Sequence, residues 1–332
     1  MSSYSTKVDT LDNGGHNGGH NGGHNGGHGY MSGVNDMSVA AAIALVRDAL
    51  INPGDTAANK FPLDPPTVTS ADSPATTCAR LERWDPWVHV QLAVQEVLNL
   101  STISANGNTI TFCFDSTDAF GARSSFSLDK PDHKKLADQL PEVIQAAELR
   151  DERLVEIIAQ IDEQWDFWSA LLPRPLSEMP ATQVLLDVAY HVSTFIGMRF
   201  KHGFGTFRPS ERSAQIVPCI PMPLHGSFPM GHATQAFATA RVLQWLIEGG
   251  TQPGLPKNPL TINLRKFAQR VGYNRVVAGL HFPIDLDAGT DLGMRIADAI
   301  MSKACSTKKS DQFPVLPSIK KMAQDEWKLF RT

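Results

Sequence analysis

LLDVAYHVSTFIGMRFKHGFGTFRP, residues 185–209, joins an apolar helical pattern to a pair of cations. Apolar residues recur in it at spacings of three and four, which places them on one face of an α-helix. They are Leu185, Val188, Ala189, Val192, Phe195 and Ile196. The pattern runs directly into Lys201, and a glycine-rich turn at 203–205 brings Arg208 back, with Pro209 stiffening the return. The stretch predicts a rigid helix that aims a lysine, with an arginine beside it.

Helical periodicity dominates the rest of the chain from Val34 onward. Strand-like alternation occurs only at Asn108–Phe114 and, more weakly, at Ser124–Leu128. Apolar stripes predict helices at Val39–Leu50 and at Leu154–Leu172, and Pro173 and Pro175 end the second one. A further helix is predicted from near Gly231 to a C-cap at Gly249–Gly250, and two more at residues 261–278 and 284–303. The sequence therefore predicts an all-α fold, a helical bundle with a small β-hairpin excursion.

The chain divides into three parts by composition. Residues 1–33 contain four copies of Asn-Gly-Gly-His, which end at His16, His20, His24 and His28. Glycine at this density is costly to order, so these residues predict a flexible arm, with transition-metal binding by the imidazoles as a less favoured alternative. Residues 34–305 are expected to form a single helical domain, and residues 306–332 an outlying C-terminal tail or arm.

The overall composition excludes several classes of function. The 332 residues are 42% hydrophobic and 19% charged with a net charge of -4, so nothing favours nucleic acid or anionic membranes as partners. No apolar run approaches the roughly 18 residues that span a bilayer, and the first ten residues lack a secretory pattern. A cytoplasmic location is the resulting expectation. The cysteines lack zinc or CxxC spacing and are expected to be reduced thiols: Cys78, Cys113, Cys219 and Cys305.

Two further clusters contain residues suited to anion binding and acid–base chemistry. They are FPMGH at 228–232 and RVVAGLHFPID at 275–285. Gly231 stands at a predicted helix start, where backbone amides point at anions, and His232 follows it. Arg275 precedes His281 by six residues, and Asp285 follows His281 by four. On a helix that spacing lets the carboxylate accept the imidazole Nδ1–H and leaves Nε2 free. Each group alone has an ordinary structural explanation; their joint order favours an oxyanion site.

The pattern K-x6-RP, then PxGH, then R-x5-H-x3-D resembles one shared by vanadium-dependent haloperoxidases and the type-2 phosphatidic acid phosphatase superfamily. That superfamily includes soluble bacterial acid phosphatases. The resemblance spans residues 201–285, about a quarter of the chain. It implies a helical bundle that binds vanadate, or phosphate in the same site, at one end.

The resemblance also implies a role for each matching residue. His281 would be the axial ligand of vanadium, His232 the acid–base group and Asp285 the residue that orients His281. The equatorial oxygens of vanadate would be held by Lys201, Arg208, Arg275 and the Gly231 amide.

Met230 departs from the family pattern, because the family usually has a serine at this vanadate-binding position. The missing hydroxyl would cost on the order of 1.5–3 kcal/mol in anion binding. A thioether is also an oxidisable neighbour for hypohalous acid.

Three reactions or roles remain open, and the first is favoured. His225, seven residues before His232, and Phe228 before the proline are similar to seaweed-type bromoperoxidases, which carry a histidine at that spacing and an aromatic residue before the proline. A second imidazole near the peroxide would assist its deprotonation; the alternative is that His225 is an ordinary loop residue. The favoured function is a vanadate-dependent haloperoxidase that uses hydrogen peroxide to oxidise bromide or iodide to a hypohalous-acid-type species, with a small organic acceptor. The alternatives are an acid phosphatase with a phosphohistidine intermediate and a non-catalytic anion- or metal-binding protein. A homodimer or larger homo-oligomer is expected.

Overall fold

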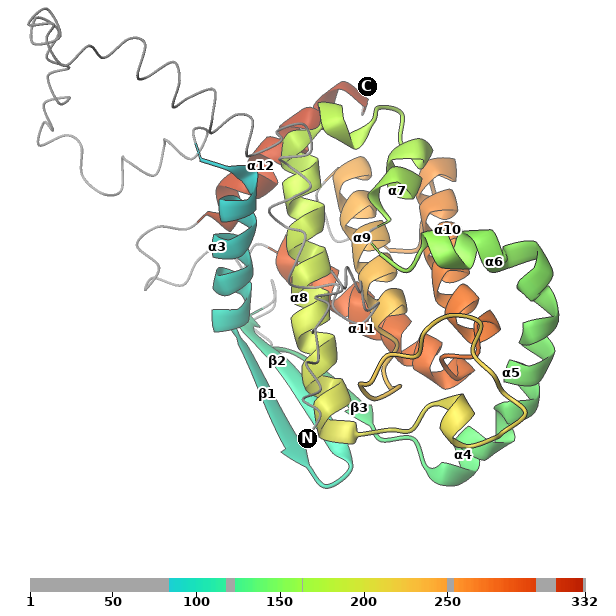
Figure 1. Ribbon diagram of the computed structural model, residues 1–332. Coiled ribbons are helices and arrows are strands. Elements are labelled where there is room, and N and C mark those ends of the chain that lie inside the picture. Colours follow the sequence, from blue (N-terminus) through green and yellow to red (C-terminus); the bar gives the residue numbers. More distant parts are fainter. Residues whose placement is uncertain (1–83, 118–122, 163, 250–253, 303–314, 331–332) are drawn as a thin grey trace, which may run out of the picture.

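The computed structural model describes residues 84–117, 123–162, 164–249, 254–302 and 315–330. The arm at 1–33, the stripe at 39–50, Cys78 and Cys305 lie outside these residues; Cys113 and Cys219 are free thiols, as predicted. The described chain is mostly helical with one small sheet, which confirms the predicted fold class (Figure 1). Among its helices, none has both the length and the apolarity needed to cross a bilayer.

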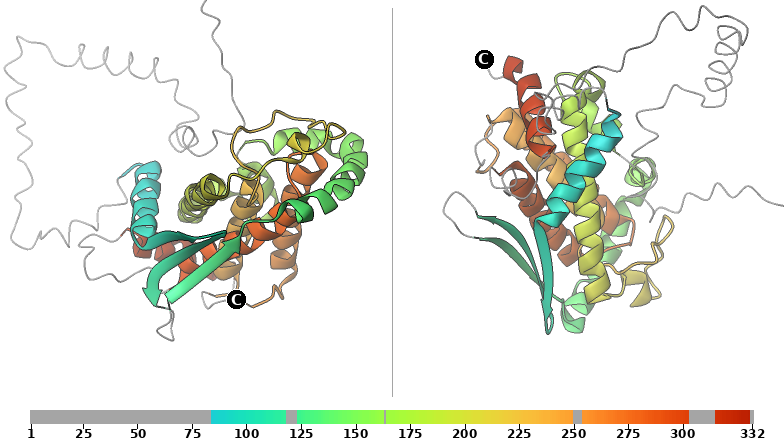
Figure 2. Two further views of the ribbon diagram at one scale, coloured as in Figure 1. Left: turned by 90° about the horizontal axis from the view of Figure 1, so that it is seen from below. Right: turned by 90° about the vertical axis from the view of Figure 1, so that its left-hand side faces the viewer.

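Four long helices form the centre of the bundle. They are α8 (Pro180–Phe204), α9 (Gly231–Ile247), α10 (Pro259–Val277) and α11 (Pro283–Met301). Helix α9 packs against the other three and is buried on nearly every side, because its sequence is apolar or small around most of its circumference. Helices α3 (Pro86–Asn99) and α12 (Leu316–Glu326) lie beside α8, on the side away from α10 (Figures 1 and 2).

The start of α9 lies unusually close to α11. A Cβ atom added to Gly289 would lie 2.5 Å from the carbonyl oxygen of Met230, and one added to Gly293 would lie 2.3 Å from that of Thr234. Only glycine permits this approach of two backbones. The amide of Met230 donates to the carbonyl of Asp285 at 2.9 Å across the same contact. The loop that opens α9 is thereby fixed against the helix that carries Asp285.

The sheet is antiparallel with the order β1-β2-β3, from β1 (Ser101–Asn106), β2 (Thr109–Thr117) and β3 (Arg123–Asp129). Figure 2 shows it as a separate layer beside the helices. The alternating residues Ile110, Phe112 and Phe114 are buried on its inner face, as their spacing predicted. Strand β1 was not predicted, because only one of its side chains, Ile103, is a large apolar one.

One predicted helix is wrong in extent. The stripe Leu154–Leu172 is divided between α6 (Arg150–Ala159) and α7 (Trp165–Leu171), and Ile158 is 52% exposed. At the end of α6 the carbonyl groups of Ile157 and of the C-cap residue Gln160 bond to side chains of α10 and α9 instead of to further helical amides. The remaining short helices are α4 (His133–Asp138) and α5 (Leu140–Ala146).

Residues 315–330 of the predicted C-terminal tail are not outlying. Within this segment α12 packs against α8 and α3, and Leu316, Ile319 and Trp327 are buried. The carboxylate of Glu326 accepts hydrogen bonds from the amides of Ala181 and Thr182, both at 2.8 Å, and from the Thr182 hydroxyl at 2.7 Å. It therefore caps the N-terminus of α8, whose own N-cap residue provides no side-chain bond.

Replacement of this cap should destabilise the whole bundle. We expect Glu326→Ala to lower the free energy of unfolding by about 2–4 kcal/mol, since three hydrogen bonds to a charged group are lost. Urea denaturation measures the change. The matched control is Asp325→Ala, which removes an exposed ion pair with Lys328 and should cost under about 1 kcal/mol. Equal effects of the two substitutions would contradict the capping role.

Candidate oxyanion site

A small cavity of about 50 Å³ lies where α8 ends and α9 begins. Its walls come from α8, the loop at 205–230, the first turns of α9 and the turn that precedes α11. The lining residues are Thr194, Met198, Lys201, Pro223, His225, Gly231, His232, Gln235, Leu280 and His281. Five of the predicted site residues are thus brought together from three distant segments of sequence.

Lys201 occupies the last turn of α8 and is 2% exposed. Its Nζ atom donates to the carbonyl oxygens of Gly226 at 2.9 Å and Ser227 at 2.8 Å, so one N–H remains for a ligand. Burial, and then the charge of Arg208, holds the pKa of Lys201 well below its usual value. A bound anion would offset both effects.

Arg208 connects the two loops that carry the imidazoles. Its Nε donates to the carbonyl of His225 at 3.2 Å, and Nη1 donates to that of Leu280 at 2.9 Å. The same Nη1 lies 3.3 Å from His281 Nε2, and Nη2 lies 3.3 Å from His225 Nδ1. Burial lowers the pKa of Arg208 to about 10, so it stays a cation at neutral pH. Because a guanidinium only donates, His281 Nε2 is an acceptor. His225 Nδ1 lies between Arg208 and the carbonyl oxygen of Gly226 at 3.2 Å, which can only accept, so these two contacts do not fix the tautomer of His225.

His281 therefore carries its proton on Nδ1, which lies 3.1 Å from Asp285 Oδ2. Burial, followed by Arg208 and Lys201, keeps the pKa of His281 well below its usual value, so the ring is neutral. Burial raises the pKa of Asp285 to about 6. The structure thus places His281 Nε2, whose lone pair accepts from Arg208 in the anion-free protein, at the cavity with a carboxylate behind the ring. A nucleophile or metal ligand requires this placement, and a bound anion would take the place of the Arg208 contact.

His232 faces the same cavity from the first turn of α9. Its Nε2 lies 3.1 Å from the carbonyl oxygen of Gln160, which can only accept, so this nitrogen carries the proton and Nδ1 is the unprotonated one. Burial, and then the charge of Arg275, lowers the pKa of His232 to about 3. Gly231 opens the helix without a side-chain cap from its N-cap residue, which leaves amides for an anion.

Arg275 is fully buried but is not among the residues that line the cavity. Its Nη2 donates to the carbonyl of Ile157 at 2.8 Å and lies 3.4 Å from Gln160 Oε1. Its Nε and Nη1 atoms have no hydrogen-bond partner among the described residues. Burial lowers its pKa to about 10, so it too remains charged. A buried guanidinium with two free donors close to His232 fits the oxygens of a tetrahedral anion such as vanadate or phosphate.

Met230 contributes no side chain to the cavity. It is fully buried in the apolar core, while its family position implies a hydroxyl on the anion. Hydrogen-bonding side chains at the cavity include Gln235, which lines it and donates to the Thr194 hydroxyl at 2.8 Å, and behind His281 lies Ser227. None of these three was predicted. Ser227 directly precedes the FPMGH cluster at 228–232, whereas nothing in the sequence pointed to Gln160 or Thr194.

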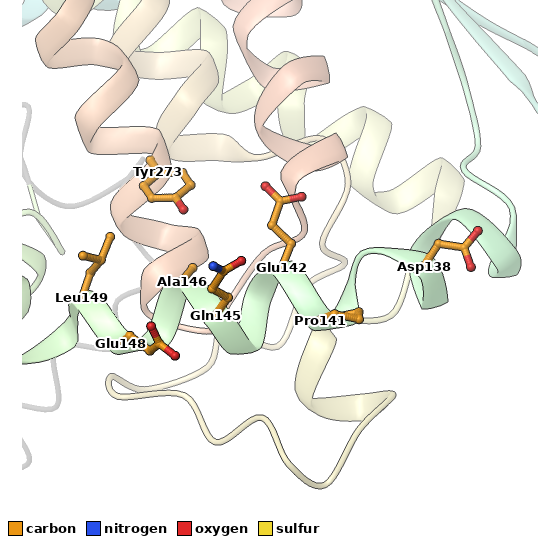
Figure 3. Close-up of a pocket in the computed structure, with 8 residues that line it drawn as sticks. All are labelled: Asp138, Pro141, Glu142, Gln145, Ala146, Glu148, Leu149 and Tyr273. Atoms are coloured by element: carbon orange, nitrogen blue, oxygen red, sulfur yellow. The ribbon is translucent and has the colours of Figure 1, made fainter.

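A larger hollow of about 660 Å³ lies on another part of the surface, between α4, α5 and α10 (Figure 3). Three exposed carboxylates, those of Asp138, Glu142 and Glu148, surround it. Their negative charge would repel an oxyanion. The smaller, cationic cavity is therefore the candidate site despite its size.

In this helical bundle a buried lysine and three histidines line one small cavity, and the buried guanidinium of Arg208 contacts two of those histidines. Residues 183–304, from α8 to just beyond α11, match the family model of the PAP2 superfamily. This superfamily includes both phosphatases and vanadium haloperoxidases. A comparison with curated proteins found no match.

Proposed function

We propose that the protein is a vanadate-dependent haloperoxidase that oxidises bromide or iodide with hydrogen peroxide. The observation that carries the proposal is the arrangement of two imidazoles on one guanidinium, with His281 Nε2 and His225 Nδ1 each 3.3 Å from Arg208. A minimal phosphatase needs a nucleophile and one acid–base group, which His281 and His232 would supply. The second imidazole on Arg208, that of His225, would act as a base toward hydrogen peroxide.

Each residue of the site has a proposed role that follows from its position. His281 Nε2 would hold the central atom, and Lys201, Arg208, Arg275 and the Gly231 amide would hold its oxygens. Vanadate, when bound, supplies the Lewis-acidic centre that activates hydrogen peroxide toward halide. Burial, and then Lys201, lowers the pKa of His225 to about 4, so its ring is neutral at pH 7 and can accept a proton from peroxide. The fixed cations then stabilise the negative charge that develops on oxygen.

The second candidate is an acid phosphatase, favoured by the same lone pair on His281. In that reaction Nε2 attacks phosphorus, the P–O ester bond breaks, and the leaving oxygen takes a proton from His232. Water would then hydrolyse the phosphohistidine. Met230 would weaken either reaction, since the cavity lacks the hydroxyl that the family provides.

One pair of assays separates the two candidates. We expect vanadate-loaded protein to halogenate an activated dione with hydrogen peroxide and bromide or iodide, and His281→Ala to reduce turnover by at least about 10³-fold. His202→Ala, on the exposed side of the same turn of α8 as Lys201, is the control and should keep full activity. Absence of turnover with both halides, together with aryl phosphate hydrolysis that His281→Ala removes, would assign the protein to the phosphatases.

A further inference from the structure

Ser227 joins His281 and Asp285 in a buried three-membered cluster. Its Oγ atom lies 2.5 Å from Asp285 Oδ2 and 3.1 Å from His281 Nδ1, and the latter two atoms are themselves 3.1 Å apart. Ser227 is 0% exposed, so bulk water does not compete for these contacts. The histidine–carboxylate pair therefore has a third member, which its sequence spacing did not predict.

The proton positions in this cluster follow from its neighbours. Arg208 donates to His281 Nε2, so the ring proton is on Nδ1. The carboxylate can only accept, so the Ser227 hydroxyl donates to Oδ2, and its lone pair remains for Nδ1–H. Asp285 Oδ2 thus receives the hydroxyl, the ring N–H and the Phe282 amide at 2.9 Å, while Oδ1 has no partner within the described chain. The hydroxyl adds a second acceptor for Nδ1–H and so favours this one tautomer.

The backbone of Ser227 fixes the opposite wall of the cavity. Its carbonyl accepts from Lys201 Nζ at 2.8 Å, and its amide donates to the carbonyl of Thr206 at 3.0 Å. The next amide, that of Phe228, donates to the Thr206 hydroxyl at 3.1 Å. One residue therefore holds both the lysine and the imidazole, and any displacement of its side chain is limited by these backbone bonds.

We propose that Ser227 is a positioning residue whose hydroxyl holds His281 in the Nδ1–H tautomer, so that the Nε2 lone pair faces the bound anion. The proposal rests on the proposed role of His281 as the group that bonds the anion. It holds for vanadate and for phosphate alike, and does not depend on which reaction follows.

The test compares Ser227→Ala with Ser193→Ala, a matched control. Ser193 is also buried, at 1% exposure, but its hydroxyl has no partner in the part of the chain that the structure describes. Nitrogen-15 NMR of histidine-labelled protein, with His281 assigned through His281→Gln, reports the tautomer without any anion. We expect wild type and Ser193→Ala to show Nδ1–H only. Ser227→Ala keeps Arg208 and Asp285 but loses the second acceptor of Nδ1–H, and should show a detectable minor fraction of the Nε2–H tautomer. Titration calorimetry with orthovanadate should give about tenfold weaker binding for Ser227→Ala alone.

The outcomes distinguish this proposal from the proposed function. An Nε2–H tautomer of His281 in the wild type overturns the positioning role. This measurement needs no variant, so it tests the proposal even if Ser227→Ala does not fold. An unchanged tautomer and affinity in folded Ser227→Ala also overturn it, while wild-type halogenation would still support the haloperoxidase. If the tautomer of His281 depends on Ser227 but the protein does not halogenate, the positioning role is supported. Only the proposed haloperoxidase reaction is then excluded.

Discussion

Arg275→Met is expected to weaken orthovanadate and orthophosphate binding by about 10²- to 10⁴-fold without destabilising the anion-free protein. Two donors of this fully buried guanidinium, Nε and Nη1, have no partner among the residues that the structure describes. Two charge-assisted hydrogen bonds to an anion at about 1.5–3 kcal/mol each give that range of affinity. In the anion-free protein a buried charge without a close counter-ion costs several kcal/mol. Its removal should offset the bond that the carbonyl of Ile157 loses.

Arg241→Met is the matched control for this prediction. Arg241 forms a two-bonded pair with Asp298, at 2.7 Å and 3.1 Å, and its side chain is 12% exposed. Its loss leaves the carboxylate without its cation, which should lower the free energy of unfolding by about 3 kcal/mol. Anion affinity, measured by calorimetry, should not change. If the Arg275→Met protein instead binds orthovanadate within about threefold of the wild-type affinity, Arg275 does not contact the anion.

Prediction from sequence succeeded where one helix carries both the pattern and the functional group. The apolar stripe of α8 was predicted to run into Lys201, and the helix does so, ending at Phe204. Gly205 then adopts a left-handed conformation with φ of 54°, which produces the predicted return toward Arg208. The spacing of His281 and Asp285 likewise predicted their contact of 3.1 Å. Each of these features depends on residues that are close in the chain.

The features that were missed depend on distant segments. Gln160 contacts His232 and Arg275, which lie 72 and 115 residues further along the chain, and no local period reports such contacts. The contact of the Gln160 carbonyl with His232 and that of the Ile157 carbonyl with Arg275 take the place of helical hydrogen bonds. The predicted single helix is therefore interrupted at the point where α6 contacts the site residues. Met230 shows a different limit of prediction from sequence. Its position in the motif implied a vanadate contact, but an apolar side chain is more stable in the core than in a polar cavity.

Anion binding is expected to raise the pKa of His232 and to take up protons near neutral pH. In the anion-free protein, burial and the charge of Arg275 lower that pKa to about 3, so the ring is neutral. A bound phosphate dianion offsets the cationic charge, and the pKa in the complex is then higher than in the free protein. Between the two values, affinity rises as pH falls, by up to tenfold per pH unit for each proton taken up.

Calorimetry with orthophosphate in buffers of different ionisation enthalpy, at pH 6 and pH 7, measures this proton uptake. His232→Gln should take up fewer protons than the wild type, whereas His202→Gln, altered on the exposed surface, should match it. The protonation of phosphate itself is common to all three proteins and cancels in the comparison. Equal uptake in wild type and His232→Gln would mean that His232 stays neutral in the complex. A neutral ring with its proton held by the carbonyl of Gln160 could not protonate a leaving group, and the phosphatase alternative would lose its acid.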